Sequence, residues 1–236
     1  MTSDQPSPLA FRNTKVSYWD GLHANAEAFE ISELYANHPN DLLVVITKDF
    51  INEERIFNAL SFTTPIETQN SVMRLSPWET LPYDLFSPHQ DIISERLSTM
   101  NYLLSERPGI VIMSAATAMQ KVPPINYIHG SSFTFATGDQ LDLNKQKLIL
   151  EGAGYQQTDI VTERGQYASR GSILDLFPMG SELPIRLDLF DDELETIRSF
   201  DPGTQLTIKN LDQFSILPAK EFPFDEDAIK KFRANW

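Results

Sequence analysis

The chain has 236 residues, of which 41% are hydrophobic and 11% aromatic, enough for one or two domains with apolar cores. The absence of cysteine excludes disulfides, thiolate metal sites and cysteine nucleophiles, and it favours an intracellular location. The formal net charge of −14, with no run of Lys or Arg, argues against direct DNA binding by this chain alone. No apolar run is long enough to cross a bilayer and no signal sequence is recognisable, so we expect a cytoplasmic protein without a membrane partner.

The first half of the chain alternates predicted helices with apolar strands. Residues 1–15 are polar and are typical of a loose lead-in. An amphipathic helix is predicted to begin at Asp20 as N-cap, and the apolar run 42–47 predicts a strand buried on both faces. A helix over 49–61 and a short strand over 72–75 follow.

A Pro-rich loop then leads into the next predicted helix. Ser87 as N-cap, Pro88 at the first helical position and Gln90 three residues after the cap form a capping box, and Pro108 ends the helix. A buried strand over 110–113 and a short helix over 115–120 complete the alternation. Residues 16–123 are therefore expected to form an α/β domain with a parallel sheet.

After Pro123-Pro124 the pattern changes. A strand over 132–136, a helix over 144–151 and several alternating strands between 155 and 217 predict a smaller α+β domain with an antiparallel sheet, over residues 124–214. Residues 215–236 are expected to be a return segment, with a helix over 225–232 that starts a further domain.

Nucleotide chemistry lacks its usual residues. A P-loop needs a Gly-rich turn followed by Lys and Ser or Thr, and no Gly-Lys dipeptide occurs. Before the first helix, where phosphates would lie, the chain carries the acidic Asp20. We therefore predict no catalytic residue and no nucleotide or other cofactor.

Metal binding also has little support. The segment Phe190-Asp191-Asp192-Glu193 resembles the acidic Mg²⁺ motif of helicases, but a solvated hairpin turn explains it without a P-loop. The four histidines lack ligand spacing and are interpreted as surface or cap residues: His23, His38, His89 and His129. We predict no metal site.

An aromatic loop precedes the helix that Pro108 ends. Its large side chains could stack on nucleic-acid bases, but no Lys or Arg lies between Ser76 and Glu95 to form the basic groove that such a platform needs. We therefore expect these side chains to pack against the domain: Trp78, Tyr83, Leu85 and Phe86.

The strand predicted over 185–190 contains an aromatic residue on its polar face. Odd positions are aliphatic and would face a core, whereas the even positions are Arg186, Asp188 and Phe190. Arg170 is placed at the start of a preceding strand over 171–177, which can pair antiparallel with 185–190. Two readings remain open at this point. Arg170, Arg186 and Phe190 form a protein-binding hot spot, or both arginines pair with nearby acids: Asp188, Asp191 or Asp192.

Four stretches resemble the N-terminal part of the bacterial transcription-repair coupling factor (Mfd) family, and together they cover nearly the whole chain from about residue 16. They are WETLPYDLFSPHQDIISERLSTM, the step Met119-Gln120-Lys121-Val122, YASRGSILDLFPMGSELPIRLDLFDDELETIRSFD and LPAKEFPFDEDAIKKFR. This part of the family is similar to UvrB. The resemblance implies a degenerate helicase-like domain without a P-loop and an inserted domain that recruits UvrA.

In that family the UvrA contact consists of two Arg and one Phe, which correspond to Arg170, Arg186 and Phe190. Leu189 departs from relatives that often carry Phe, and we expect it to affect packing only. The resemblance implies a non-catalytic region that brings UvrA to stalled RNA polymerase and contacts other domains of a full-length ATP-dependent DNA translocase. The alternatives are a nucleotide- or DNA-dependent enzyme domain, or an architectural domain that restrains the translocase.

Overall fold

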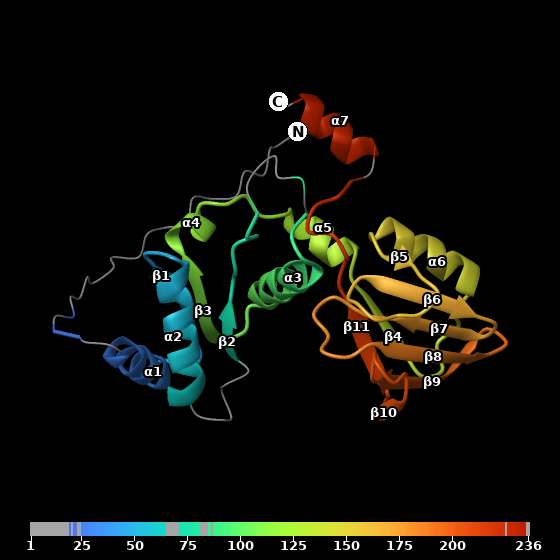
Figure 1. The fold of residues 1–236 in the computed structure, drawn as a ribbon, viewed down its shortest axis with the longest axis horizontal. Coiled ribbons are helices and arrows are strands. Elements are labelled where there is room, and N and C mark those ends of the chain that lie inside the picture. Colours follow the sequence, from blue (N-terminus) through green and yellow to red (C-terminus); the bar gives the residue numbers. More distant parts are fainter. Residues whose placement is uncertain are drawn as a thin grey trace, which may run out of the picture.

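The computed structural model describes residue 19 and residues 21–22, 25–64, 71–80, 85, 87–224 and 226–234. A three-stranded parallel sheet and a six-stranded, mainly antiparallel sheet lie on opposite sides of one helix, α3 (Figure 1). The expected combination of a parallel and an antiparallel sheet is confirmed. The helix predicted to begin at Asp20 is observed from residue 26, and Asp20 itself lies outside the described residues.

The parallel sheet has the strand order β1-β3-β2. Its elements are α1 (Ala26–Asn37), β1 (Leu42–Thr47), α2 (Phe50–Thr63), β2 (Val72–Arg74), α3 (Gln90–Leu104) and β3 (Gly109–Ser114). Apolar side chains of α1 and α2 pack on one face of the sheet, and α3 lies at the other (Figure 1). Asp49 caps α2 by accepting a hydrogen bond from the Asn52 backbone N–H at 2.9 Å.

The strand β1 is less buried than its apolar sequence predicts. It lies at the edge of the described sheet, and the side chains of Leu42, Val44 and Ile46 are exposed, the last to 61%. Leu43 and Val45 point the other way and pack against the helices. The prediction of burial on both faces is therefore wrong, because an apolar run cannot distinguish an edge strand from a central one.

The predicted capping box is also wrong. The helix α3 begins at Gln90, and its N-cap is His89, whose Nδ1 accepts a hydrogen bond from the Asp91 backbone N–H at 3.3 Å. Pro88 and Ser87 thus precede the helix rather than start it. The His89 imidazole, rather than the Ser87 hydroxyl, is thus the side chain that satisfies a free N–H at the start of the helix, that of Asp91.

A second group of elements builds the six-stranded sheet, in the order β10-β9-β8-β7-β6-β5, and a separate β4–β11 pair. The short helix α4 (Ala115–Ala118) follows β3 and contacts β3 and β1 of the parallel sheet. The elements after it are, in chain order, α5 (Ile125–Gly130), β4 (Phe133–Ala136), α6 (Leu143–Gly152), β5 (Gln156–Gln157), β6 (Gln166–Arg170), β7 (Ile173–Leu176), β8 (Ile185–Phe190), β9 (Glu193–Phe200), β10 (Thr207–Leu211), β11 (Gln213–Ile216) and α7 (Glu226–Ala234). The helix α7 stands apart from both sheets (Figure 1). Among the helices of the described ranges, none is both long and apolar enough to cross a membrane.

The largest apolar core lies between the six-stranded sheet and α3. Leu97 and Met100 of α3 belong to the same buried cluster as Leu174 of β7 and Leu187 of β8. The helix α3 therefore contributes to the core of the half that follows it in sequence. The two halves of the chain share this helix through apolar packing.

A buried ion pair joins α3 to the segment after β11. Arg96 Nε and Nη2 donate to the two carboxylate oxygens of Glu221 at 2.9 and 2.8 Å, and both side chains are almost fully buried. Trp78 Nε1 donates to the same carboxylate at 2.6 Å, and the Trp78 ring centroid lies 4.8 Å from Arg96 Cζ. Arg96 also donates to the Ser76 carbonyl. Because both charged groups are removed from water, the loss of either one would leave the other buried without a counter-charge.

The two described side chains of the aromatic loop, Trp78 and Leu85, differ in their packing. Trp78 packs as predicted, against Arg96 and, edge-on at 6.0 Å, against the Phe222 ring. Leu85 is 95% exposed, so the prediction that it packs against the domain is wrong. Tyr83 and Phe86 lie outside the described residues.

The buried pair yields a test of stability. Replacing Glu221 by Ala leaves the Arg96 guanidinium buried without its counter-charge, and we expect the free energy of unfolding to fall by about 3–5 kcal/mol. Equilibrium unfolding in denaturant measures this change in the free energy of unfolding. Glu27→Ala, which removes the partly exposed 2.5 Å pair with Arg55, is the matched control and should cost about 1 kcal/mol or less. Equal losses in the two variants would contradict the assignment.

Candidate protein-binding surface

Strand alternation divides the six-stranded sheet into two faces. Ile185, Leu187 and Leu189 of β8 point into the core, which confirms the predicted inward position of Leu189. The opposite side, called the outer face here, bears Arg186 and Asp188 of β8. The register places four further residues on it: Ala168 and Arg170 of β6, and Ile173 and Asp175 of β7.

Phe190 ends β8 on the outer face and is 71% exposed. A tight turn of Asp191 and Asp192 connects it to β9, and Asp191 adopts a left-handed φ of +53°, which Asp tolerates better than most residues. The acidic segment is thus a hairpin turn with exposed side chains, as predicted. Within the described residues, no group of three or more His, Asp or Glu side chains is arranged to hold a metal ion.

Arg170 occupies a different strand position from the predicted one. It is the last residue of β6, and the turn Gly171-Ser172 separates it from β7. The predicted strand over 171–177 begins too early because alternation alone does not reveal a two-residue turn. The corrected register still places Arg170 on the outer face, since it pairs with Ile173, which in turn pairs with Asp188.

Arg186 is held by a buried carboxylate. Its Nε and Nη2 donate to the two carboxylate oxygens of Asp175 at 2.7 and 2.8 Å, and Asp175 is 1% exposed. The Arg186 guanidinium also lies 4.7 Å from the centroid of the Phe200 ring. The hydrogen bonds to Asp175 raise the pKa of Arg186, which keeps the guanidinium charged.

The same carboxylate attracts Arg170 more weakly. Arg170 Nη2 lies 3.8 Å from Asp175, beyond hydrogen-bond distance, and the Arg170 side chain is 59% exposed against 20% for Arg186. The ion pairs of both arginines are with Asp175 and not with the acids expected from sequence. Asp188 pairs with Arg198 instead, and Asp191 and Asp192 lie in the exposed turn.

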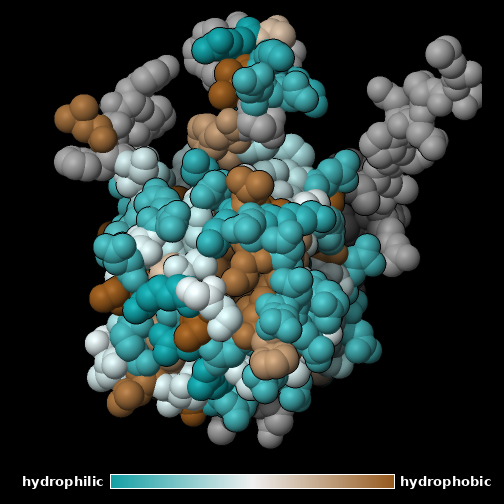
Figure 2. All heavy atoms as spheres, turned by 90° about the vertical axis from the view of Figure 1, so that its right-hand side faces the viewer, coloured by the Kyte–Doolittle hydropathy of each residue, from teal (hydrophilic) through white to brown (hydrophobic). Residues whose placement is uncertain are grey.

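Arg170 and Phe190 lie at the same end of the sheet. The Leu189 backbone N–H donates to the Ser172 carbonyl at 3.0 Å, which ties the end of β8 to the turn after Arg170. Arg186 lies further along β8, opposite Asp175. The outer face thus presents an exposed Phe and a firmly paired Arg on β8, and a loosely paired Arg on β6, with β7 between the two strands. Figure 2, viewed from this end of the molecule, shows hydrophobic patches among mainly hydrophilic side chains.

Sequence reasoning missed two charged residues of the outer face. Asp175 is the only polar residue in the Ile-Leu-Asp-Leu segment of β7, a signal that could have placed it beside Arg186. Arg198 lies directly opposite Arg186 on β9, but the register shift between Asp188 and Leu189 means that counting back from the hairpin turn does not find this pair. With Glu193, which lies opposite Phe190, the outer face carries three arginines and three acidic residues, whereas the chain as a whole has a net charge of −14.

Comparisons with known proteins point to one family. The model of the UvrB interaction domain matches residues 133–222, a range that includes the outer face. Over 206 residues the chain is 44% identical to the transcription-repair-coupling factor of Escherichia coli, covering 87% of this chain and 18% of the relative. It is 44% identical over 212 residues to that of Haemophilus influenzae (89% and 18%) and 28% identical over 201 residues to that of Bacillus subtilis (85% and 17%).

The chain thus spans less than a fifth of the length of these relatives. Within that span the similarity extends over both sheets, because it covers most of the chain. The chain therefore belongs to the family of transcription-repair-coupling factors.

Proposed function

We propose that this chain is a non-catalytic protein-binding region that recruits UvrA to stalled RNA polymerase, as part of a longer ATP-dependent DNA translocase. Arg170, Arg186 and Phe190 are the proposed UvrA contacts. The observation that carries the proposal is Phe190, which is exposed on the same sheet face as two arginines, within the range matched by the UvrB interaction domain. Exposed aromatic and Arg side chains are typical anchors of protein interfaces.

The charge of the outer face supports this role. Arg170 is largely exposed and loosely paired, so it can exchange its contact with Asp175 for a carboxylate of a partner at little cost. Burying Phe190 against a partner would remove its large apolar surface from water, worth roughly 1.5–3 kcal/mol. Together they offer one electrostatic and one apolar anchor.

We also propose that the parallel-sheet half, residues 16–123, is a degenerate helicase-like domain without nucleotide binding. Its described β1–α2 connection contains Lys48 and Asp49 but no glycine, and the Asp49 carboxylate occupies the N-terminus of α2, where a phosphate would otherwise bind.

The UvrA contact is tested by isothermal titration of UvrA with the Arg170→Ala, Arg186→Ala, Phe190→Ala triple variant. If these residues are anchors, binding should weaken by at least about 2 kcal/mol, roughly thirtyfold. Because Arg186→Ala leaves Asp175 buried without its main partner, the Arg170→Ala, Phe190→Ala double variant is measured as well.

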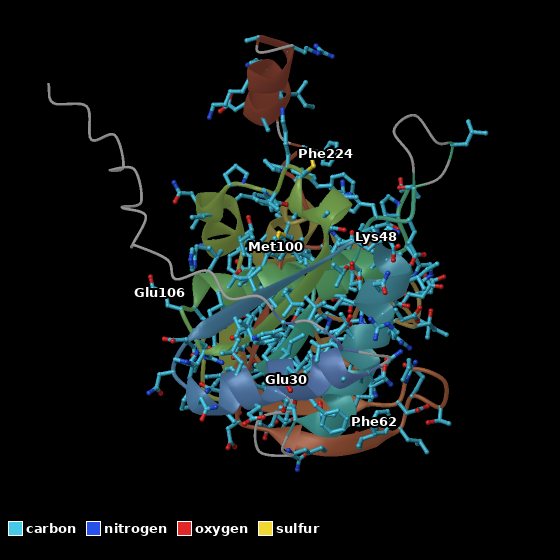
Figure 3. All side chains as sticks on the ribbon, turned by 90° about the vertical axis from the view of Figure 1, so that its left-hand side faces the viewer. Glu30, Lys48, Phe62, Met100, Glu106 and Phe224 are labelled. Atoms are coloured by element: carbon cyan, nitrogen blue, oxygen red, sulfur yellow. The ribbon has the colours of Figure 1, made fainter. Side chains whose placement is uncertain are left out.

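The matched control is Phe62→Ala, Arg107→Ala, which removes an exposed Phe and an exposed Arg from the other half of the chain. Figure 3 shows Phe62 projecting from α2. The control should bind UvrA like the parent. Parental affinity of the folded triple and double variants would overturn the proposed contact.

The absence of nucleotide binding is tested by titrating Mg-ATP into the chain, with and without duplex DNA. We expect neither heat of binding nor hydrolysis, because the phosphate-binding loop and its Lys are missing. Saturable heat would instead support the alternative of a nucleotide-dependent domain.

A further inference from the structure

The two proposed arginine contacts share one acidic neighbour, yet they differ in how firmly they are held. We propose that Asp175 is a positioning residue of the UvrA-binding surface: it fixes the orientation of Arg186 and keeps Arg170 nearby without immobilising it. This inference rests on the proposed function, since the surface that Asp175 organises is the one assigned to UvrA.

The geometry around Arg186 is that of a fixed side chain. Two parallel hydrogen bonds of 2.7 and 2.8 Å join its guanidinium to Asp175, and this fork arrangement defines both distance and orientation. The Phe200 ring, 4.7 Å away, provides a further contact. Three of the five guanidinium N–H groups are not used by Asp175 and can be offered to a partner without further ordering of the side chain.

Arg170 is held differently by the same carboxylate. Its closest approach to Asp175 is 3.8 Å, and most of its side chain is exposed. The attraction between these charges keeps the guanidinium near Arg186, while the lack of a hydrogen bond leaves its orientation adjustable. The surface therefore combines one preorganised cation with one adaptable cation.

Burial explains why Asp175 rather than Asp188 has this role. Asp175 has 2% of its side chain exposed and accepts both hydrogen bonds from Arg186. Moving Arg186 away would leave the Asp175 carboxylate buried without a counter-charge, so the two groups stay together. Asp188 has 23% of its side chain exposed and contacts Arg198 and Thr196 of β9. Asp188 is thus a matched control: an aspartate on the same face, paired with another arginine.

Asp175→Asn is the informative substitution. Asn has nearly the same shape as Asp but carries no charge. One of the two acceptor oxygens is replaced by an NH2 group, which is a donor and cannot accept a hydrogen bond from Arg186. The fork cannot form with Asn, so Arg186 should lose its fixed orientation. Arg170 should lose the charge that keeps it nearby.

The positioning role is measured first on the chain alone, by the exchange of arginine Nε–H protons with water in nitrogen-15 NMR spectra. In the parent, the Arg186 Nε–H should exchange at least tenfold more slowly than that of Arg170. Asp175→Asn should abolish the difference and Asp188→Asn should preserve it. Equal exchange rates in the parent would overturn the inference, and this comparison needs no substitution.

UvrA affinity is then measured by titration for the same variants. We expect Asp175→Asn to weaken binding at least tenfold and Asp188→Asn to change it less than twofold, with both variants folded by circular dichroism. Folded Asp175→Asn with parental affinity would overturn the role of Asp175 while leaving the proposed function intact. If the parent itself fails to bind UvrA, the proposed function fails, and the NMR comparison still decides whether Asp175 orients Arg186.

Discussion

Asp175 lies on an interior strand of the six-stranded sheet and is 1% exposed, so its negative charge must be neutralised by neighbouring side chains. Breaking such a buried pair by removing one partner costs about 3–5 kcal/mol in typical proteins. Arg186 meets the requirement through two short hydrogen bonds, and Arg170 adds a longer contact. Two cations therefore lie close together on one face of a strongly acidic chain, the face that also carries the exposed Phe190.

A buried charge is also neutralised by a bidentate partner at the junction between the two halves of the chain. Arg96 and Glu221 are separated by 125 positions in sequence and form a bidentate pair that excludes water. Trp78 donates to the same carboxylate, so the loop before α3 and the segment after β11 are tied to one point. This pair and the apolar core that α3 shares with the six-stranded sheet hold the two halves of the chain together. The sheet that carries the proposed UvrA surface is therefore firmly attached to α3.

Short-range patterns in the sequence predict some of this arrangement. Alternation within β8 correctly separates Leu189 from Phe190, because a half-buried strand imposes a period of two. The same alternation cannot locate partners on other strands, so it left open whether the arginines pair with nearby acids, and it did not identify Asp175 as their partner. It also does not predict the pairing of β8 with β9, whose register shifts between Asp188 and Leu189, or the exposure of the edge strand β1, which depends on sheet order rather than on local sequence.

The central claim is that the outer face around Phe190 contacts UvrA. It is tested most directly by replacing Phe190 with a photo-crosslinking phenylalanine derivative and irradiating the complex with UvrA, with Phe62 replaced in the same way as the control. The account predicts a cross-link to UvrA from position 190 and none from position 62, although both side chains are highly exposed. Cross-linking from position 62 alone would contradict it.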